Sequence, residues 1–272
     1  MESPLVSSTW LLNNLSDPDL VILDASQQDN KAGLVSDSSN LQIIGARYFD
    51  IKHKFSAVNS PFPNTLLTQE EFQEQCRELG LNTTSKLVVY DNLGVYTSPR
   101  VWWMFKLMGF DNVAVLNGGL PDWISQGNQV ESVQNQTFKK GDFQAVFDVS
   151  KIRDNHFLTK NLNQKKALVI DARSAGRFNG ITPEPRKGLR GGHIPNSINI
   201  PFTDVLEDGK FKTKNQLIAL FNNFKIENNL LVFSCGSGIT ACIVLLAASL
   251  VLENKKALYD GSWTEWAQLN EF

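Results

Sequence analysis

The stretch "FSCGSGITACIVLLAASLVL", residues 233–252, has the pattern of a strand end, a glycine-rich loop and a long apolar helix. Strand, tight turn and helix in that order are typical of an α/β fold, whose sites form at the carboxyl ends of parallel strands. Cys235 lies at this junction. A free cysteine is often a small buried apolar residue, but beside a helix N-terminus it can be held as a reactive thiolate.

Segments of the first half recur in the second half in the same order. Asp24 and Asp171 each close an apolar run, and they are 147 positions apart. The run "KLVVYDNLG" (86–94) corresponds to "NLLVFSCGSG" (229–238) at an offset of 144. Because several segments match at nearly one period, the chain is predicted to contain two homologous domains.

We place the two domains at residues 1–140 and 150–272, with the polar stretch 125–142 as a linker. Their strand-like runs are apolar on both faces, as in a sheet that helices cover on each side. Between such runs lie helix patterns, one of which begins after Thr68 as N-cap and ends before Gly80. The predicted fold is therefore α/β, with two tandem domains that are each a mainly parallel sheet flanked by helices.

Superposing the halves at the offset of 144 places Asp91 of the first half on Cys235 of the second. A buried carboxylate is costly without partners, so this shared position is predicted to be a loop mouth open to solvent. The other two cysteines, Cys76 and Cys242, fall in helix patterns and are predicted to lie in the core.

The loop after Cys235 carries no charged residue. Its glycines let the backbone curl around the sulfur and its hydroxyl groups add donors, so the loop is a cradle for a thiolate, a persulfide or a small anion. Cys235 and Ser237 are the catalytic candidates. The residues predicted to surround the bound group are Gly236, Gly238, Ile239 and Thr240.

Other loop chemistries fit less well. A phosphatase of the CxxxxxR type needs an arginine six positions after Cys235, where Ala241 stands. The chain holds neither a GxxxxGK run followed by Ser or Thr nor a GxSxG elbow. A thiol hydrolase would need a histidine base, and His53, His156 and His193 cannot be placed by sequence alone.

Composition narrows the partners and the compartment. Of 272 residues, 42% are hydrophobic and 20% are charged, with a formal net charge of -2, so no overall field attracts nucleic acid or a membrane surface. The start "MESPLVSSTWLLNN" is unlike a signal or transit peptide, and the apolar run Ala241–Leu252 is too short to cross a bilayer. Three cysteines without metal-ligand spacing favour neither a disulfide framework nor a metal site. We expect a cytoplasmic protein with no metal, no cofactor, no nucleic-acid partner and no membrane partner.

Three motifs together resemble the rhodanese superfamily, and within it the 3-mercaptopyruvate sulfurtransferase branch. They are "CGSGITA" (235–241), "SPRVWWMF" (98–105) and "DARSAGRFNGITPEPRKG" (171–188), and the resemblance spans the chain from Leu5 to Trp266. It implies that Cys235 takes sulfur from a small-molecule donor and becomes a persulfide. The sulfur then passes to a thiol, thioredoxin or cyanide acceptor. It also implies that the first domain, with its aspartate, is catalytically silent.

The resemblance also bears on the sulfur donor. Thiosulfate enzymes of the superfamily carry basic loop residues, as in CRKG, where this chain has Gly236 and Ser237. Arg177 and Arg186 match the arginines with which the mercaptopyruvate branch binds the donor carboxylate, and a guanidinium accepts a carboxylate in bidentate fashion. The predicted donor is therefore 3-mercaptopyruvate, with pyruvate as the product. Thiosulfate sulfurtransferase remains the nearest alternative.

One departure from the superfamily concerns a proton relay. In the family, the counterpart of Ser237 works with an aspartate and a histidine, but here those positions hold Lys52 and Asn64. His53 is one residue away, and a solvated loop histidine is the simpler interpretation. The altered relay keeps open a second alternative, a persulfide relay or binding module with low turnover.

Overall fold

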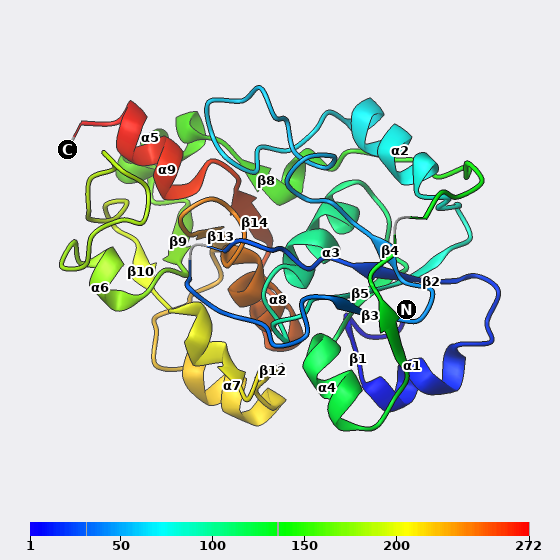
Figure 1. Ribbon diagram of the computed structural model, residues 1–272. Coiled ribbons are helices and arrows are strands. Elements are labelled where there is room, and N and C mark those ends of the chain that lie inside the picture. The colour runs from blue at the N-terminus through cyan, green and yellow to red at the C-terminus, as the bar shows by residue number, and fades with distance from the viewer. Residues whose placement is uncertain (31, 135, 272) are drawn as a thin grey trace. The chain divides into compact units, whose positions relative to one another are not determined.

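The computed structural model describes residues 1–30, 32–134 and 136–271 (Figure 1). The chain divides into two compact units. Unit 1 comprises Met1–Ala57, Leu66–Asp148 and Asp208–Lys210. Unit 2 comprises Val58–Thr65, Val149–Glu207 and Phe211–Phe272. The division follows the sequence repeat except for the two short exchanged segments.

Unit 1 is built on a parallel five-stranded sheet in the order β1-β6-β5-β2-β4. The strands are β1 (Leu5–Val6), β2 (Leu20–Asp24), β4 (Arg47–Tyr48), β5 (Lys86–Tyr90) and β6 (Val113–Leu116). The helices are α1 (Ser8–Asn14), α2 (Gln69–Glu78), α3 (Ser98–Leu107) and α4 (Gly119–Ser125). Helix α3 packs against β5 and β6.

Unit 2 is built on a second parallel five-stranded sheet in the order β10-β9-β13-β14-β8. The strands are β8 (Ile152–Arg153), β9 (Ala167–Asp171), β10 (Ile198–Asn199), β13 (Leu230–Ser234) and β14 (Lys256–Tyr259). The helices are α5 (Asn155–Gln164), α6 (Ala175–Phe178), α7 (Lys214–Phe221), α8 (Ala241–Val251) and α9 (Ser262–Leu269). Two 3₁₀ turns, η1 (Val149–Lys151) and η2 (Phe202–Val205), and the strand pair β11 (Leu206–Glu207) and β12 (Lys210–Phe211) complete the second half.

The two sheets have the same strand order when one is read backwards, which confirms the predicted α/β fold of two tandem domains. Asp24 at the end of β2 pairs with Tyr90, and its counterpart Asp171 at the end of β9 pairs with Ser234. The repeat also places Trp123 and Trp266 in equivalent cores, where they are 1% and 0% exposed. The carboxyl ends of β5 and β13 therefore carry equivalent loops, which begin at Asp91 and Cys235.

Local sequence features set the helix ends as predicted. The Thr68 hydroxyl accepts the backbone N–H of Glu71, whose side chain in turn accepts the Thr68 N–H, so α2 begins with a capping box. Gly80 follows the end of α2 with a φ of 70°, a left-handed conformation that favours glycine. Helix α8 is buried along most of its length, as the apolar run from Ala241 predicts.

The prediction that residues 125–142 form a linker needs correction. The stretch 125–142 is not only a linker, because β7 (Val130–Ser132) pairs antiparallel with β3 (Leu41–Ile43). Glu131 ties the pair together by accepting hydrogen bonds from Gln42 Nε2 at 2.8 Å and Gly45 N at 3.0 Å. The domain boundaries at 140 and 150 stay predictions.

Candidate active site

Cys235 follows directly after β13, and the loop from it leads into α8. Its backbone N–H donates to Ser262 Oγ at 3.2 Å, and its carbonyl accepts the N–H of Trp263 at 2.9 Å. The carbonyl of Gly236 accepts both the N–H and the hydroxyl of Thr264, at 3.1 Å and 2.6 Å. The start of α9 therefore fixes the first two loop residues. No motif in the sequence indicated Ser262 or Thr264 as a support for the loop.

Gly236 lies against both predicted substrate-binding arginines. A Cβ atom at this position would be 2.9 Å from Arg177 Nη2 and 3.6 Å from Arg186 Nη1. The absence of a side chain at Gly236 thus lets the two guanidinium groups approach the loop backbone. The structure brings the two arginines, Arg177 and Arg186, close to Gly236, which directly follows Cys235. This is the arrangement expected if these residues form one site.

Ser237 is held by two other side chains of unit 2. Its hydroxyl oxygen accepts hydrogen bonds from Arg186 Nη2 and from Asn64 Nδ2, each at 3.0 Å. Asn64 Nδ2 also donates to the carbonyl oxygen of Ser237 at 3.1 Å. Sequence comparison with the family marked Asn64 only as a departure, and the structure makes it a direct neighbour of Ser237.

The rest of the loop turns into the helix. Gly238 has a φ of 79°, and its carbonyl accepts a hydrogen bond from Cys242 Sγ at 3.3 Å. Ile239 is buried, and Thr240 precedes α8 without a side-chain capping hydrogen bond. Cys242 is buried in α8, in agreement with a core role, and none of the three cysteines, all of which lie in the described residues, forms a disulfide.

Arg177 is anchored by a carboxylate that sequence reasoning missed. Its Nε and Nη2 donate to Glu184 at 3.2 Å and 2.5 Å, and Arg173 Nη1 donates to the same carboxylate at 2.7 Å. Arg173 also forms an ion pair with Asp171 at 2.6 Å and is fully buried. Burial by itself lowers the pKa of Arg173, but the carboxylates of Asp171 and Glu184 raise it above its ordinary value. A lone acid between two arginines in "RFNGITPEPR" is the sequence feature that could have indicated Glu184.

The loop of unit 1 corrects the prediction of a solvent-open position. Asp91 is 1% exposed, and Cys235 is 2% exposed. Asp91 Oδ2 accepts the backbone N–H groups of Tyr96, Thr97 and Ser98 at 2.9, 3.0 and 2.9 Å, and the Ser98 hydroxyl at 2.6 Å. The other oxygen accepts the Leu93 N–H at 3.1 Å. A buried carboxylate is tolerated here because the loop itself supplies its partners.

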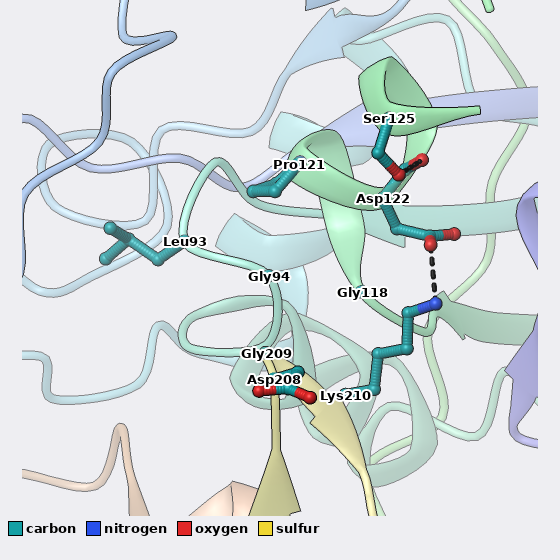
Figure 2. A pocket seen from close by; sticks show the side chains of 9 residues that line it. All are labelled: Leu93, Gly94, Gly118, Pro121, Asp122, Ser125, Asp208, Gly209 and Lys210. Atoms are coloured by element: carbon teal, nitrogen blue, oxygen red, sulfur yellow. Dashed lines mark hydrogen bonds and ion pairs between the residues drawn. The ribbon is translucent and has the colours of Figure 1, made fainter. Parts of the chain in front are cut away.

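Two further features belong to unit 1. The His53 side chain is 69% exposed, with Nδ1 3.1 Å from Asp50 Oδ1, as expected of a solvated loop histidine. A cavity of about 330 Å³ in unit 1 is lined by Leu93, Gly94, Gly118, Pro121, Asp122, Ser125, Asp208, Gly209 and Lys210 (Figure 2). Partial burial raises the pKa of Asp122, but hydrogen bonds from Lys210 and Ser8 lower it below its ordinary value overall. Lys210 and Asp122 form an ion pair at 2.5 Å, so the charge of the lysine at the cavity wall is balanced by this carboxylate.

Comparison with known proteins places the chain in a family. The rhodanese-like domain family matches residues 7–126 and 154–269. The 3-mercaptopyruvate sulfurtransferase of Mus musculus is 38% identical over 96% of this chain and 91% of the mouse protein. The thiosulfate sulfurtransferase of Cricetulus griseus is 36% identical over 96% of this chain and 91% of its own length. The crystal structure of the 3-mercaptopyruvate sulfotransferase from Escherichia coli is similar, with a TM-score of 0.84 and 34% identity over 96% of this chain and 99% of that chain.

The chain therefore belongs to the rhodanese family and contains two rhodanese-like domains. The resemblance to the superfamily and to its 3-mercaptopyruvate branch is confirmed by these matches. Among the described residues, no helix combines the length and the apolar character needed to cross a membrane.

A Gly236→Ala variant tests the approach of Arg177 to the loop. The added methyl group meets Arg177 Nη2 at 2.9 Å, so the guanidinium has to move away. We expect KM for 3-mercaptopyruvate to rise roughly tenfold, the effect of weakening one charged hydrogen bond, measured by steady-state kinetics. In an Arg177→Ala background the same methyl group should be harmless. An equal effect in both backgrounds would contradict this account.

Proposed function

We propose that the chain is a 3-mercaptopyruvate sulfurtransferase in which Cys235 carries the sulfur. The Cys235 thiolate attacks the donor sulfur, and an S–S bond forms as the C–S bond of the donor breaks. The C–S electron pair leaves with pyruvate as its enolate, which takes a proton from solvent. The sulfur keeps its proton and remains as a persulfide. A thiol, thioredoxin or cyanide then attacks the outer sulfur and releases the Cys235 thiolate.

The convergence of two arginines on the loop carries the proposal. Arg177 and Arg186 both approach the position of the missing Gly236 side chain. Their forked guanidinium groups suit a planar carboxylate, which 3-mercaptopyruvate has and thiosulfate lacks. Glu184 holds Arg177 by two hydrogen bonds, so this arginine is already oriented before a donor binds.

The other loop residues supply donors without adding charge. Ser237 provides a hydroxyl group. We assign to the backbone N–H groups of Gly236, Gly238, Ile239 and Thr240 the role of facing the negative charge on the sulfur and the enolate. Unit 1 has an internal carboxylate, Asp91, at the position of the nucleophile, so we assign the chemistry to the domain at 150–272 and none to the domain at 1–140.

Sulfur loading of the reduced protein tests the function. The protein is exposed briefly to 3-mercaptopyruvate or to thiosulfate without an acceptor, and its intact mass is measured. We expect the gain of one sulfur atom, mapped to Cys235, to be much faster with 3-mercaptopyruvate. Faster loading from thiosulfate would instead make the chain a thiosulfate sulfurtransferase, as the hamster relative is named. No loading from either donor would favour a binding module, which the loss of the family histidine at Asn64 makes a specific alternative.

An Arg186→Ala variant tests the carboxylate site. Loss of one good charged hydrogen bond is expected to lower kcat/KM for 3-mercaptopyruvate about ten- to a hundredfold. Thiosulfate turnover should fall less, because that donor has no carboxylate. Arg177→Ala should behave similarly, whereas Arg190→Ala is the matched control, because Arg190 donates to the carbonyls of Ala267 and Asn270. Unchanged mercaptopyruvate kinetics in both site variants would make the donor assignment wrong.

The acceptor and the compartment belong to the same proposal. A sulfurtransferase needs a sulfur donor and a thiophilic acceptor, and we expect a small thiol, a thioredoxin or cyanide to serve as acceptor. We also expect the protein to act in a reducing, cytoplasmic compartment, in keeping with its three described cysteines, none of which forms a disulfide.

A further inference from the structure

The hydroxyl group of Ser237 receives two hydrogen bonds of known direction. Arg186 Nη2 lies 3.0 Å from Oγ, and a guanidinium can only donate. Asn64 Nδ2 lies 3.0 Å from the same oxygen. The orientation of the Asn64 amide is fixed independently, because the atom facing the Ser237 carbonyl at 3.1 Å has to be the donor.

Both lone pairs of Ser237 Oγ are therefore occupied. A hydroxyl group has two acceptor lone pairs and one proton, so the proton has to point away from Arg186 and Asn64. Among the described residues, the hydrogen bonds of Ser237 include two donors to this oxygen and no acceptor for its proton. Within the described residues this proton has no acceptor, so it is available to a bound molecule.

We infer that Asn64 is a positioning residue which, together with Arg186, fixes Ser237 as a hydrogen-bond donor toward the bound sulfur donor. The inference rests on the proposed function, since it names what the loop does for that reaction. Asn64 acts through Ser237 and does not itself touch the reacting atoms. The Ser237 proton stabilises the negative charge that develops as the pyruvate enolate departs.

This arrangement replaces proton transfer by a fixed hydrogen bond. The amide nitrogen of Asn64 has no lone pair with which to accept the Ser237 proton, so Ser237 keeps its proton through the reaction. Arg186 is the ionisable group that donates to Ser237, while Cys235 lies two positions earlier in the loop and Arg177 lies near Gly236. No histidine is among the hydrogen-bond partners of Ser237 in the described parts of the chain. The pH profile of the rate is therefore expected to lack a step at about pH 6.5, the ordinary pKa of histidine.

The backbone at Asn64 permits sharp substitutions. Its φ of 59° is left-handed, a conformation in which Asn, Asp and His are the favoured residues other than glycine. Asn64→Asp keeps shape and backbone but replaces the donor by an acceptor, which faces the Ser237 carbonyl and draws the hydroxyl proton to itself. Asn64→His keeps the backbone and introduces a group that titrates.

Steady-state kinetics of these variants with 3-mercaptopyruvate test the inference. We expect kcat to fall roughly tenfold for Asn64→Ala and on the order of a hundredfold for Asn64→Asp, with KM changed little, because only a transition-state interaction is lost. Asn64→His should add a step near pH 6.5 to the rate profile. The matched control is Asn196→Ala, since Asn196 is exposed and has a φ of 64°.

A double-mutant cycle separates a positioning role from a structural one. If Asn64 acts through Ser237, Asn64→Ala should cost nothing further in a Ser237→Ala background. Additive losses in an active protein, or an Asn64→Asp variant as active as wild type, overturn the inference alone. A wild-type protein that takes no sulfur from 3-mercaptopyruvate overturns the proposed function as well. A Tm within a few degrees of that of the Asn196→Ala control shows that a variant is folded. If Asn64→Ala does not fold, Asn64→His takes its place in the test.

Discussion

A Cys235→Ser variant is expected to lose sulfur transfer by on the order of 10⁴-fold or more, the scale on which activity falls when a covalent nucleophile is removed. A serine hydroxyl is not ionised near neutral pH, and oxygen cannot form the persulfide. The fold should persist, because the contacts of Cys235 that the structure describes use its backbone, to Ser262 Oγ and to the N–H of Trp263. The measurement is steady-state turnover together with the intact mass after exposure to 3-mercaptopyruvate.

The matched control for this loss is Cys76→Ala. Cys76 is buried in α2, and burial raises the pKa of its thiol well above the ordinary value, so it stays protonated. Sulfur loading of this variant is expected to equal that of the wild type. Should Cys235→Ser still gain a sulfur atom, or Cys76→Ala fail to, the assignment of the nucleophile would be wrong.

An Asp91→Ala variant is expected to lower the free energy of unfolding of unit 1 by roughly 3–5 kcal/mol. The substitution removes an acceptor from four backbone N–H groups and one hydroxyl group in a loop where Asp91 is 1% exposed. Asp91→Asn should lower the free energy of unfolding by a smaller amount. One side-chain oxygen can still accept hydrogen bonds, whereas the new amide N–H₂ group faces loop donors that it cannot satisfy.

Denaturant unfolding monitored by tryptophan fluorescence measures this effect, and calorimetry gives the corresponding thermal transition. The data are fitted with separate transitions for the two units. The control is Asp37→Ala, which removes the same charge from an exposed position of unit 1. If Asp91→Ala and Asp37→Ala unfold alike, the carboxylate does not hold the loop together.

Features that depend on neighbours in the sequence could be predicted. The N-cap at Thr68, the helix end at Gly80 and the buried helix from Ala241 all follow from local patterns. The sequence repeat also predicted which strands of the two units correspond, since Asp24 and Asp171 end equivalent strands.

Features that depend on distant or backbone partners could not be predicted. The partners of Asp91 are mostly backbone N–H groups, which every residue except proline has, so no sequence pattern revealed that its charge is satisfied in the core. Asn64 and Ser237 are 173 positions apart, and their contact depends on the path of a short exchanged segment. Glu184 was missed because an acid near two arginines is usually a surface ion pair.

The close approach of Arg177 to Gly236 has a consequence for how donor preference can evolve. A basic side chain at position 236 and the guanidinium of Arg177 need the same volume, since even a Cβ atom there lies 2.9 Å from Nη2. A single substitution toward a loop that binds a dianion would create a crowded pair of like charges, and loss of Arg177 alone would leave Arg186 without its proposed partner in binding the carboxylate. The two positions are therefore epistatic, and a change of donor requires coordinated substitutions at both.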